Sequence, residues 1–223
     1  MRRPQRRHSG RQGVLGLVTA VAVPYRTITR HEGVAFGGWL MPVAPPMVSA
    51  ATGALLVPYG GGADLWLACV ALFGVSLIAA LLVIGQVWGR LVTQGEGAAR
   101  MAPTLWIVLG PLGQSVTAVH LLAGDKTDVV LLYGVPVIGF ALFWGALATA
   151  LTLRAVRAGL PFSLTWWSFT FPVGTVVTGL GGLAARTGSR PVEVVTMSLY
   201  AVLAAAWLVV AVRTLRDFRL LTR

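Results

Sequence analysis

The chain has 223 residues, of which 56% are hydrophobic and 11% charged, and its formal net charge is +11. Average soluble domains carry roughly a quarter charged residues, so this composition excludes an ordinary soluble domain and is typical of a membrane protein. The charged residues are also segregated, which leaves six long uncharged runs between Gly33 and Val212. We therefore expect an all-α integral membrane protein.

The first 33 residues combine a basic start with a short apolar stretch. The sequence MRRPQRRHSGRQG precedes Val14–Val23, which is only ten residues long. This order resembles the n-region and h-region of a signal peptide, but it is not followed by an A-x-A-like cleavage site and a soluble mature domain. We favour the alternative, in which residues 1–33 are a basic cytoplasmic segment that includes the remnant of an upstream membrane helix.

The remaining sequence predicts a transmembrane domain over 34–216 and a basic cytoplasmic tail at 217–223. A helix needs about 20 apolar residues to cross the hydrocarbon core of a bilayer, and each uncharged run is long enough. Consecutive runs are joined by short loops, which favours three helical hairpins. The six predicted helices are 34–58, 65–88, 103–123, 129–152, 163–185 and 193–213.

Basic residues predict the orientation of these helices. Fifteen of the 18 lie before the first predicted helix, after the second, after the fourth or after the sixth, whereas only Lys126, Arg186 and Arg190 lie on the other side. Lys and Arg are enriched in cytoplasmic loops, so we expect both termini in the cytoplasm and a multi-pass protein of the plasma membrane. The same bias explains the net charge by contact with anionic lipid headgroups, without a nucleic-acid partner.

The first, third and fifth predicted helices share a repeat that the other three lack. In each, a proline is followed six residues later by a threonine and then by glycine or alanine, and the prolines are 65 and 61 residues apart, the length of one helical hairpin. A tryptophan precedes each proline by five to seven residues. The repeated residues are Trp39, Pro46 and Thr52, then Trp106, Pro111 and Thr117, then Trp167, Pro172 and Thr178.

Glycine and proline are unevenly distributed between the two sets of helices. The odd-numbered helices hold 18 of these residues, counted over 34–58, 103–124 and 161–185, and the even-numbered ones seven, counted over 64–88, 129–152 and 191–212. Small residues allow membrane helices to pack closely, and a proline kink survives in a membrane only where protein or a water-filled cavity satisfies the freed carbonyl group. We therefore expect kinked odd helices inside and even helices outside, facing lipid. A single kink is explained by packing alone, but three in register favour a lined pathway.

Several polar and aromatic residues are candidates for lining that pathway. Kinked helix ends offer partial positive charge to an anion, and Gln114 either lies in the path or bridges two helices. His120 is interpreted as an interfacial residue, and for each threonine a bond to its own helix is the alternative to pore lining. Phe169 or Phe171, beside Pro172, would form a hydrophobic gate, although packing against neighbouring helices is the commoner role of such a ring. The candidate hydroxyl groups are those of Thr52, Ser115, Thr117, Thr175 and Thr178.

Other chemistry is disfavoured. Cys69 is the only cysteine, the three histidines have no metal-ligand spacing, and no charged residue lies deep in a predicted helix. An intramembrane enzyme would require a nucleophile with a base, or clustered metal ligands, and an ion-coupled carrier usually has intramembrane charged groups. We therefore expect a protein that is not an enzyme and has neither metal nor cofactor, with a small anion and the lipid bilayer as its partners.

Three stretches carry a resemblance to a known family. GGWLMPVAPPMVSAATGALLVP (37–58), PTLWIVLGPLGQSVTA (103–118) and PFSLTWWSFTFPVGTVVTG (161–179) resemble the tellurite-resistance/dicarboxylate transporter family. That family includes fungal malate permeases and sulfite efflux pumps and is related to the slow anion channels of plants. The resemblance implies a quasi-five-fold fold of ten helices, with the odd helices around a central pore that a phenylalanine of the ninth helix closes. WWSFTFP matches that helix, which makes Phe171 the first gate candidate and Phe169 the second.

The resemblance also implies that the family has more helices than this sequence predicts. The six predicted helices match the family's helices five to ten, so three hairpins are present where the family has five. Three alternatives follow: a chain start assigned too far downstream, a truncated and inactive fragment, or an assembly of several copies. The function that the resemblance implies is membrane transport of small anions, most of all C4-dicarboxylates such as malate, or sulfite, through a proline-kinked pore.

Overall fold

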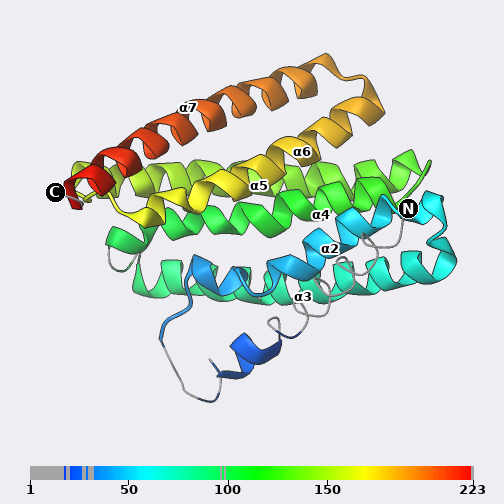
Figure 1. The fold of residues 1–223 in the computed structure, drawn as a ribbon, viewed down its shortest axis with the longest axis horizontal. Helices are drawn as coiled ribbons and strands as arrows, with labels where there is room; N and C mark the ends of the chain where they lie inside the picture. The colour runs from blue at the N-terminus through cyan, green and yellow to red at the C-terminus, as the bar shows by residue number, and fades with distance from the viewer. Residues whose placement is uncertain are drawn as a thin grey trace.

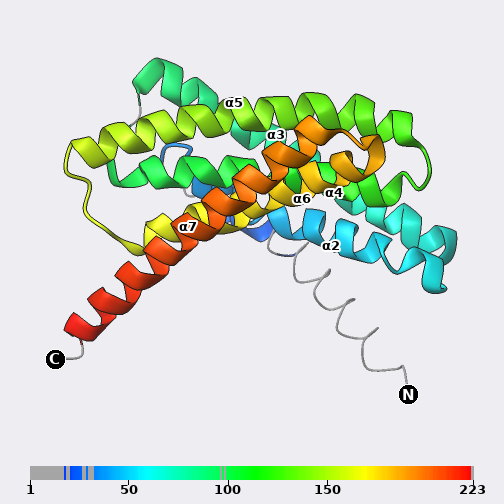
Figure 2. The same cartoon turned by 90° about the horizontal axis from the view of Figure 1, so that it is seen from above.

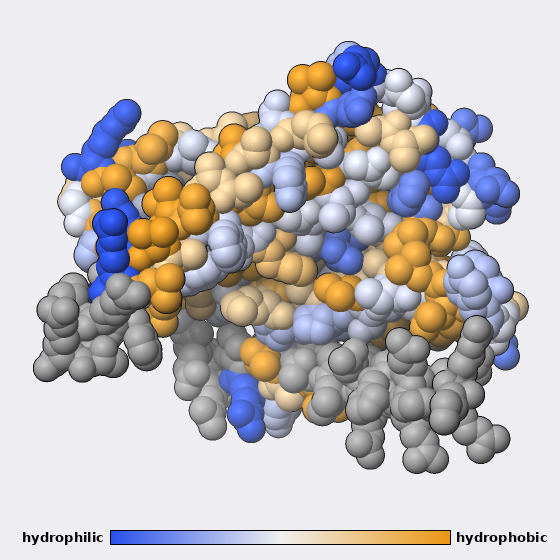
Figure 3. Space-filling model, turned by 45° about the horizontal axis from the view of Figure 1, so that its top comes forward, coloured by the Kyte–Doolittle hydropathy of each residue, from blue (hydrophilic) through white to orange (hydrophobic). Residues whose placement is uncertain are grey.

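The computed structural model describes residues 18, 21–26, 29, 33–95, 97 and 99–221, and for 217–221 it describes the backbone alone. Within these residues every regular element is helical. Figure 1 shows the long helices running side by side, and Figure 3 shows hydrophobic side chains across the middle of one face with hydrophilic ones gathered towards its ends. Five helices are long and apolar enough to cross a membrane: Gly62–Gln94, Ala99–Leu122, Thr127–Arg157, Leu164–Thr187 and Arg190–Arg216.

The first predicted span, 34–58, is not one continuous helix. It consists of the 3₁₀ turn η1 (Gly37–Leu40), the helix α2 (Ala44–Ala54) and the 3₁₀ turn η2 (Val57–Tyr59). Prolines cause the interruption, because a proline is tolerated in the first turn of an α-helix but not in its interior. With 11 residues, α2 is about 16 Å long, roughly half the hydrocarbon thickness. Six continuous spanning helices are therefore not confirmed.

The three repeated segments share one local structure. Each begins as 3₁₀ helix and continues as α-helix, and Pro46, Pro111 and Pro172 are each the third residue of the α-helical part. The proline ring clashes with a carbonyl group four residues back, so the α-helix cannot extend towards the N-terminus. The predicted kinks are thus 3₁₀-to-α junctions, in register in all three segments. The second and third pairs are η3 (Ala99–Val108) with α4 (Leu109–Leu122), and η4 (Leu164–Phe169) with α6 (Thr170–Thr187).

The helices that follow the repeated segments are longer than the sequence predicts. They contain no 3₁₀ segment, and at both ends they continue past the apolar run into polar residues. Each packs against the repeated helix before it: α3 on α2, α5 on α4, and α7 on α6. Their bounds are Gly62–Gln94 for α3, Thr127–Arg157 for α5 and Arg190–Leu221 for α7.

Helix α4 lies at the centre of the arrangement. It packs against α2 on one side and α6 on the other, and α5 covers it, as Figures 1 and 2 show from two directions. Of the apolar window in Ala99–Leu122, 56% is buried, against 6% in Arg190–Arg216. The repeated helices therefore form the packed centre of the described chain, and α7 has most of its surface free for lipid.

Glycines allow α4 and α6 to touch along their backbones. A Cβ atom added to Gly113 would lie 2.6 Å from the Thr175 carbonyl oxygen, and one added to Gly179 would lie 3.0 Å from the Gly113 carbonyl oxygen. Small residues at such crossings are characteristic of tightly packed membrane helices. At these two glycines the α4–α6 seam leaves no room for a side chain.

Tryptophans tie two of the repeated segments to their partner helices. The indole nitrogen of Trp106 donates a hydrogen bond to Thr152 Oγ1 at 3.1 Å, and that of Trp167 donates to Thr214 Oγ1, also at 3.1 Å. Both tryptophans precede their proline by five residues, whereas Trp39 precedes Pro46 by seven and lines a cavity beside α3 instead. The tryptophan contact is therefore repeated in the two segments where tryptophan precedes proline by five residues.

Candidate functional site

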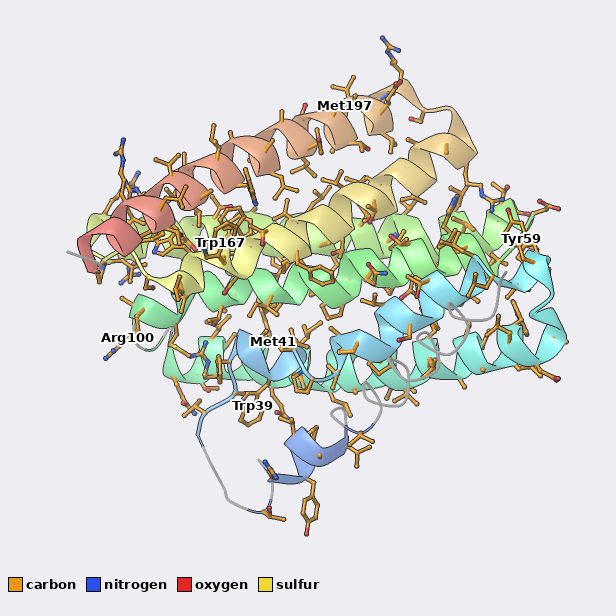
Figure 4. All side chains as sticks on the ribbon, in the orientation of Figure 1. Trp39, Met41, Tyr59, Arg100, Trp167 and Met197 are labelled. Carbon is orange, nitrogen blue, oxygen red and sulfur yellow. The ribbon has the colours of Figure 1, made fainter. Side chains whose placement is uncertain are left out.

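A cavity of about 620 Å³ lies where the three repeated segments meet. Figure 4 labels two residues of its wall, Met41 after η1 and Trp167 in η4. The wall has no Asp, Glu, Lys, Arg or His side chain, and its side-chain polar groups are the hydroxyls of Ser49 and Ser168 and the Trp167 indole. It also contains the first residues of each α-helix: Ala44 and Pro45 of α2, Gly110 and Pro111 of α4, and Phe171 and Pro172 of α6.

Phe171 borders this cavity with 52% of its surface exposed. Its ring lies against Gly110 of α4, since a Cβ atom added to Gly110 would lie 3.7 Å from Phe171 Cε1. The ring therefore lies beside Gly110 at the junction of α4 and α6, at a distance that would be ordinary van der Waals contact for a Cβ atom.

Phe169 lies on the other side of the same segment. Its ring packs edge-on against Trp106, with 6.3 Å between ring centroids, and it lines a second cavity, between α5, α6 and α7. Residues two apart on a helix point to different faces, and the structure assigns Phe171, the first gate candidate, to the cavity of the repeats.

The three prolines of the repeat are buried, and Pro111 and Pro172 contribute to the cavity wall. Pro46 is turned into the protein, and its neighbour Pro45 lines the cavity instead. The prolines thus shape the wall because the α-helices begin there. The polar groups of the wall come from other residues.

The structure brings together two of the three repeated threonines. The hydroxyl oxygens of Thr117 and Thr178 are 3.1 Å apart, which links α4 to α6. Thr52 is exposed on α2 and donates its hydroxyl hydrogen back to the Val48 carbonyl at 2.9 Å. Thr52 and Thr117 lie one and two helical turns beyond wall residues, on the same helix faces. Half-buried Gln114 lies between the cavity and Thr117 along α4.

Two other candidate hydroxyl groups are turned inwards. Ser115 is buried and donates to the Leu112 carbonyl at 2.8 Å. Thr175 is buried against α4, with its hydroxyl 2.7 Å from the Pro172 carbonyl oxygen and 3.1 Å from that of Gly110. The expectation that these two hydroxyls line the pathway is wrong, because Thr175 is turned towards α4 and Ser115 is buried with its hydroxyl bonded to its own helix.

With this geometry established, comparison with known proteins identifies the family. The family model SLAC1, described as voltage-dependent anion channel, matches residues 12–215. The chain belongs to the SLAC1 family. This confirms the resemblance that the three repeated motifs indicate.

Relatives of this SLAC1-family chain include transporters from archaea and fungi. The uncharacterized transporter MJ0762 of Methanocaldococcus jannaschii is 26% identical over 189 residues, which cover 80% of this chain and 55% of the relative. The sulfite efflux pump SSU1 of Arthroderma otae is 24% identical over 213 residues, which cover 84% of this chain and 56% of the relative. The chain thus spans about half the length of the curated relatives it matches. No solved structure matches.

One role in this SLAC1-family chain is not predicted by its sequence, that of Arg186. Its side chain reaches from α6 to the end of α4, with Nη2 3.3 Å from the His120 carbonyl oxygen and close to that of Gly124, and Nε 3.4 Å from His120 Nδ1. A guanidinium group there stabilises the carbonyl end of a helix. His120 is therefore part of the contact between α4 and α6. The signal in the sequence was a basic residue in the last turn of a predicted helix.

No group of three or more His, Cys, Asp or Glu side chains suited to a metal ion occurs among the residues that the structure describes. Together with the uncharged cavity wall, this leaves hydroxyl groups, backbone and helix ends as the chemistry of the site.

Proposed function

We propose that this chain forms one side of a membrane pathway for small anions, with sulfite and C4-dicarboxylates such as malate as the substrates. The observation that carries the proposal is the cavity bordered by the three repeated segments, with Phe171 in its wall. Membership in an anion-channel family supports the class of solute. The sulfite efflux pumps among the relatives support sulfite, and malate rests on the resemblance of the motifs.

The selectivity of this pathway would come from weak, distributed interactions. Three α-helices begin at the cavity, and the N-terminal end of a helix carries partial positive charge. The hydroxyl groups of Ser49 and Ser168 in the wall offer hydrogen bonds to anion oxygens. Further along, Thr117 and Thr178 would do so in exchange for their bonds to carbonyl oxygens of their own helices. Conduction requires binding weak enough to permit release, which suits a wall without a fixed cation.

Phe171 is the proposed gate. Its half-exposed ring lies over Gly110 beside the cavity, where a hydrophobic group restricts water and ions. Replacing the ring by a methyl group would widen the path without removing a polar group, so flux would rise.

The wider architecture belongs to the same proposal. We infer a quasi-five-fold arrangement of ten helices in which α2, α4 and α6 face the pathway, within the plasma membrane and with both termini in the cytoplasm. Arg100 and Tyr59 lie at opposite ends of the molecule (Figure 4), and the ends of α3, α5 and α7 near Arg100 hold the arginines that predict the cytoplasmic side. The rest of the enclosure would come from additional chain or from further copies.

The test is anion flux through vesicles that contain the full chain. Uptake of sulfite and of malate is measured for the wild type, for Phe171→Ala and for Phe169→Ala as a matched control on the same helix. We expect Phe171→Ala to raise flux several-fold and Phe169→Ala to leave flux per folded molecule unchanged. Absence of flux from all three would favour an inactive fragment, and equal flux from all three would contradict the gate.

A further inference from the structure

A second cavity, of about 370 Å³, lies between α5, α6 and α7, on the side of α6 away from the proposed pathway. We call it the α5–α7 cleft. Its wall is formed mainly by apolar residues, such as Leu142 and Gly145 of α5, Val173 of α6, and Val202 and Ala206 of α7. Nothing in the proposed anion pathway uses it.

The polar side-chain groups of the α5–α7 cleft already have partners. Thr149 donates to the Gly145 carbonyl at 2.7 Å, Thr152 accepts the Trp106 indole hydrogen at 3.1 Å, and the Trp166 indole donates to the Pro161 carbonyl at 3.4 Å. An ordered water requires two to four polar partners. The cleft therefore suits hydrocarbon, and its volume is more than twice the roughly 150 Å³ of an apolar cavity that holds benzene.

The length of the α5–α7 cleft matches one leaflet of a bilayer. On α5 its wall runs from Ala141 to Thr152, which is about 16 Å of α-helix. The hydrocarbon core is about 30 Å thick, so the cleft is as long as one leaflet is deep. Val202 on its α7 side is 62% exposed, which leaves the cleft open to surrounding lipid. One acyl chain of a phospholipid fits this length and polarity.

Arginines lie at the end of the cleft marked by Thr152. The bonds from Trp106 to Thr152 and from Trp167 to Thr214, with Phe169 packed on Trp106, hold the C-terminal parts of α5 and α7 at a similar level. Figure 1 shows both helices ending on the same side of the molecule, and Figure 2 shows α7 diverging from α5 towards that end. Exposed side chains of Arg157, Arg213 and Arg216 lie at these ends. Anionic headgroups are attracted to such basic residues.

The neighbouring junction between α3 and α5 carries larger side chains. Four aromatic rings lie there: Trp88 lies 6.1 Å from Trp144 and 6.3 Å from Phe143, and Phe140 lies 6.0 Å from Trp144. At the α5–α7 cleft the corresponding surface carries small residues, including Gly145 and Ala206. The opening is thus a property of this junction and not of the repeat as a whole.

We propose that the α5–α7 cleft binds one acyl chain of an anionic phospholipid, whose headgroup lies between the C-terminal ends of α5 and α7 and is attracted by Arg157 and Arg213. This goes beyond the proposed anion pathway and does not depend on it. The apolar wall selects hydrocarbon, the length selects a single leaflet, and the arginines select negative charge.

The test uses the full chain in phosphatidylcholine vesicles that contain phosphatidylglycerol brominated in the middle of its acyl chains. Bromine quenches tryptophan fluorescence on contact, and Trp106 and Trp166 border the cleft. Equally brominated phosphatidylcholine is the reference lipid. We expect brominated phosphatidylglycerol to reach half-maximal quenching at about a tenfold lower mole fraction than brominated phosphatidylcholine. A difference of this size corresponds to the attraction of one to two arginines for an anionic lipid.

Two variants locate the bound chain. Gly145→Leu fills the cleft and should abolish the quenching seen at low mole fraction. Gly139→Leu is its control, because it lies on the same helix, is exposed, and has no atom within 4 Å of an added Cβ atom. The double variant Arg157→Gln with Arg213→Gln leaves the cleft open and should reduce the preference for phosphatidylglycerol to less than about twofold.

Three results would overturn the proposal: equal quenching by the two lipids in the wild type, wild-type quenching in Gly145→Leu, or a second copy of the chain cross-linked into the cleft with no quenching. If Gly145→Leu does not fold, as judged by circular dichroism and gel filtration, the double arginine variant decides. A preference that survives that variant contradicts the proposed headgroup site.

Discussion

Two cavities lie on opposite sides of α6, and their walls differ in which hydrogen-bonding groups are available to a solute. The cavity of the repeats, about 620 Å³, has the hydroxyls of Ser49 and Ser168 and three helix starts in its wall. The α5–α7 cleft, about 370 Å³, has hydroxyl and indole groups that are bonded within the protein. Volume alone would not separate an anion path from a lipid site. The availability of hydrogen-bonding groups does.

Phe171 and Phe169 show how one segment serves both cavities. The two residues are separated by a single position, yet Phe171 borders the cavity of the repeats and Phe169 packs on Trp106 beside the cleft. Substitutions in or near α6 should therefore divide into those that change flux and those that change stability.

The largest expected effect comes from the seam between α4 and α6. Gly113→Ala places a Cβ atom 2.6 Å from the Thr175 carbonyl oxygen, so the two backbones must separate, and we expect a loss of about 3 kcal/mol in the free energy of unfolding. Thermal unfolding in detergent measures it. The control is Gly181→Ala on α6, where an added Cβ atom meets nothing within 4 Å. Equal stability of the two variants would contradict the close seam.

Phe169→Ala should destabilise the protein more than Phe171→Ala. Removing the half-buried ring of Phe169 leaves Trp106 without its aromatic neighbour and should cost about 2 kcal/mol. The half-exposed Phe171 should cost less than about 1 kcal/mol, although its removal raises flux. Unfolding and flux are measured on the same samples, and we expect Phe169→Ala to have the larger effect on stability and Phe171→Ala the larger effect on flux. A larger stability loss for Phe171→Ala would assign that ring a packing role.

The bond from Trp106 to Thr152 should have a smaller effect. A double-mutant cycle with Trp106→Phe and Thr152→Val isolates the interaction, and we expect a coupling energy of about 1 kcal/mol. The same cycle with Trp167→Phe and Thr214→Val should give a similar value, because both bonds measure 3.1 Å. Coupling in one hairpin alone would show that the two tryptophans are not equivalent.

The smallest expected effect concerns Thr117 and Thr178. Their hydroxyl contact of 3.1 Å resembles other hydrogen bonds between membrane helices, which contribute about 0.6 kcal/mol on average. We expect Thr117→Val to lower stability by this amount and to reduce anion flux about twofold, if flux depends on the hydroxyl groups. Thr196→Val is a control, because its hydroxyl bonds to the Val192 carbonyl of its own helix at 2.7 Å. Unchanged flux in Thr117→Val would remove these hydroxyls from the pathway.

One-dimensional patterns were sufficient for much of this protein. Hydropathy and charge predict the helical membrane class and locate the N-terminal ends of α3, α5 and α7 to within three residues, because the cost of burying a charge in lipid is local to each residue. The C-terminal ends lie five to eight residues beyond the predicted ones. The spacing of proline, threonine and tryptophan predicts a repeated unit, because these separations are counted directly along the sequence. The motifs also predict the family, which the match over residues 12–215 confirms.

Tertiary structure decided the rest, because it depends on residues far apart in the chain. Hydropathy cannot show that 34–58 is broken into η1, α2 and η2, since the interrupted stretch is as apolar as a continuous helix. The inward turn of Thr175 towards Gly110, the separation of Phe171 from Phe169, and the reach of Arg186 to His120 depend on how α4 and α6 cross. A helix fixes which residues share a face, but only its neighbours decide whether that face meets protein, lipid or an open cavity.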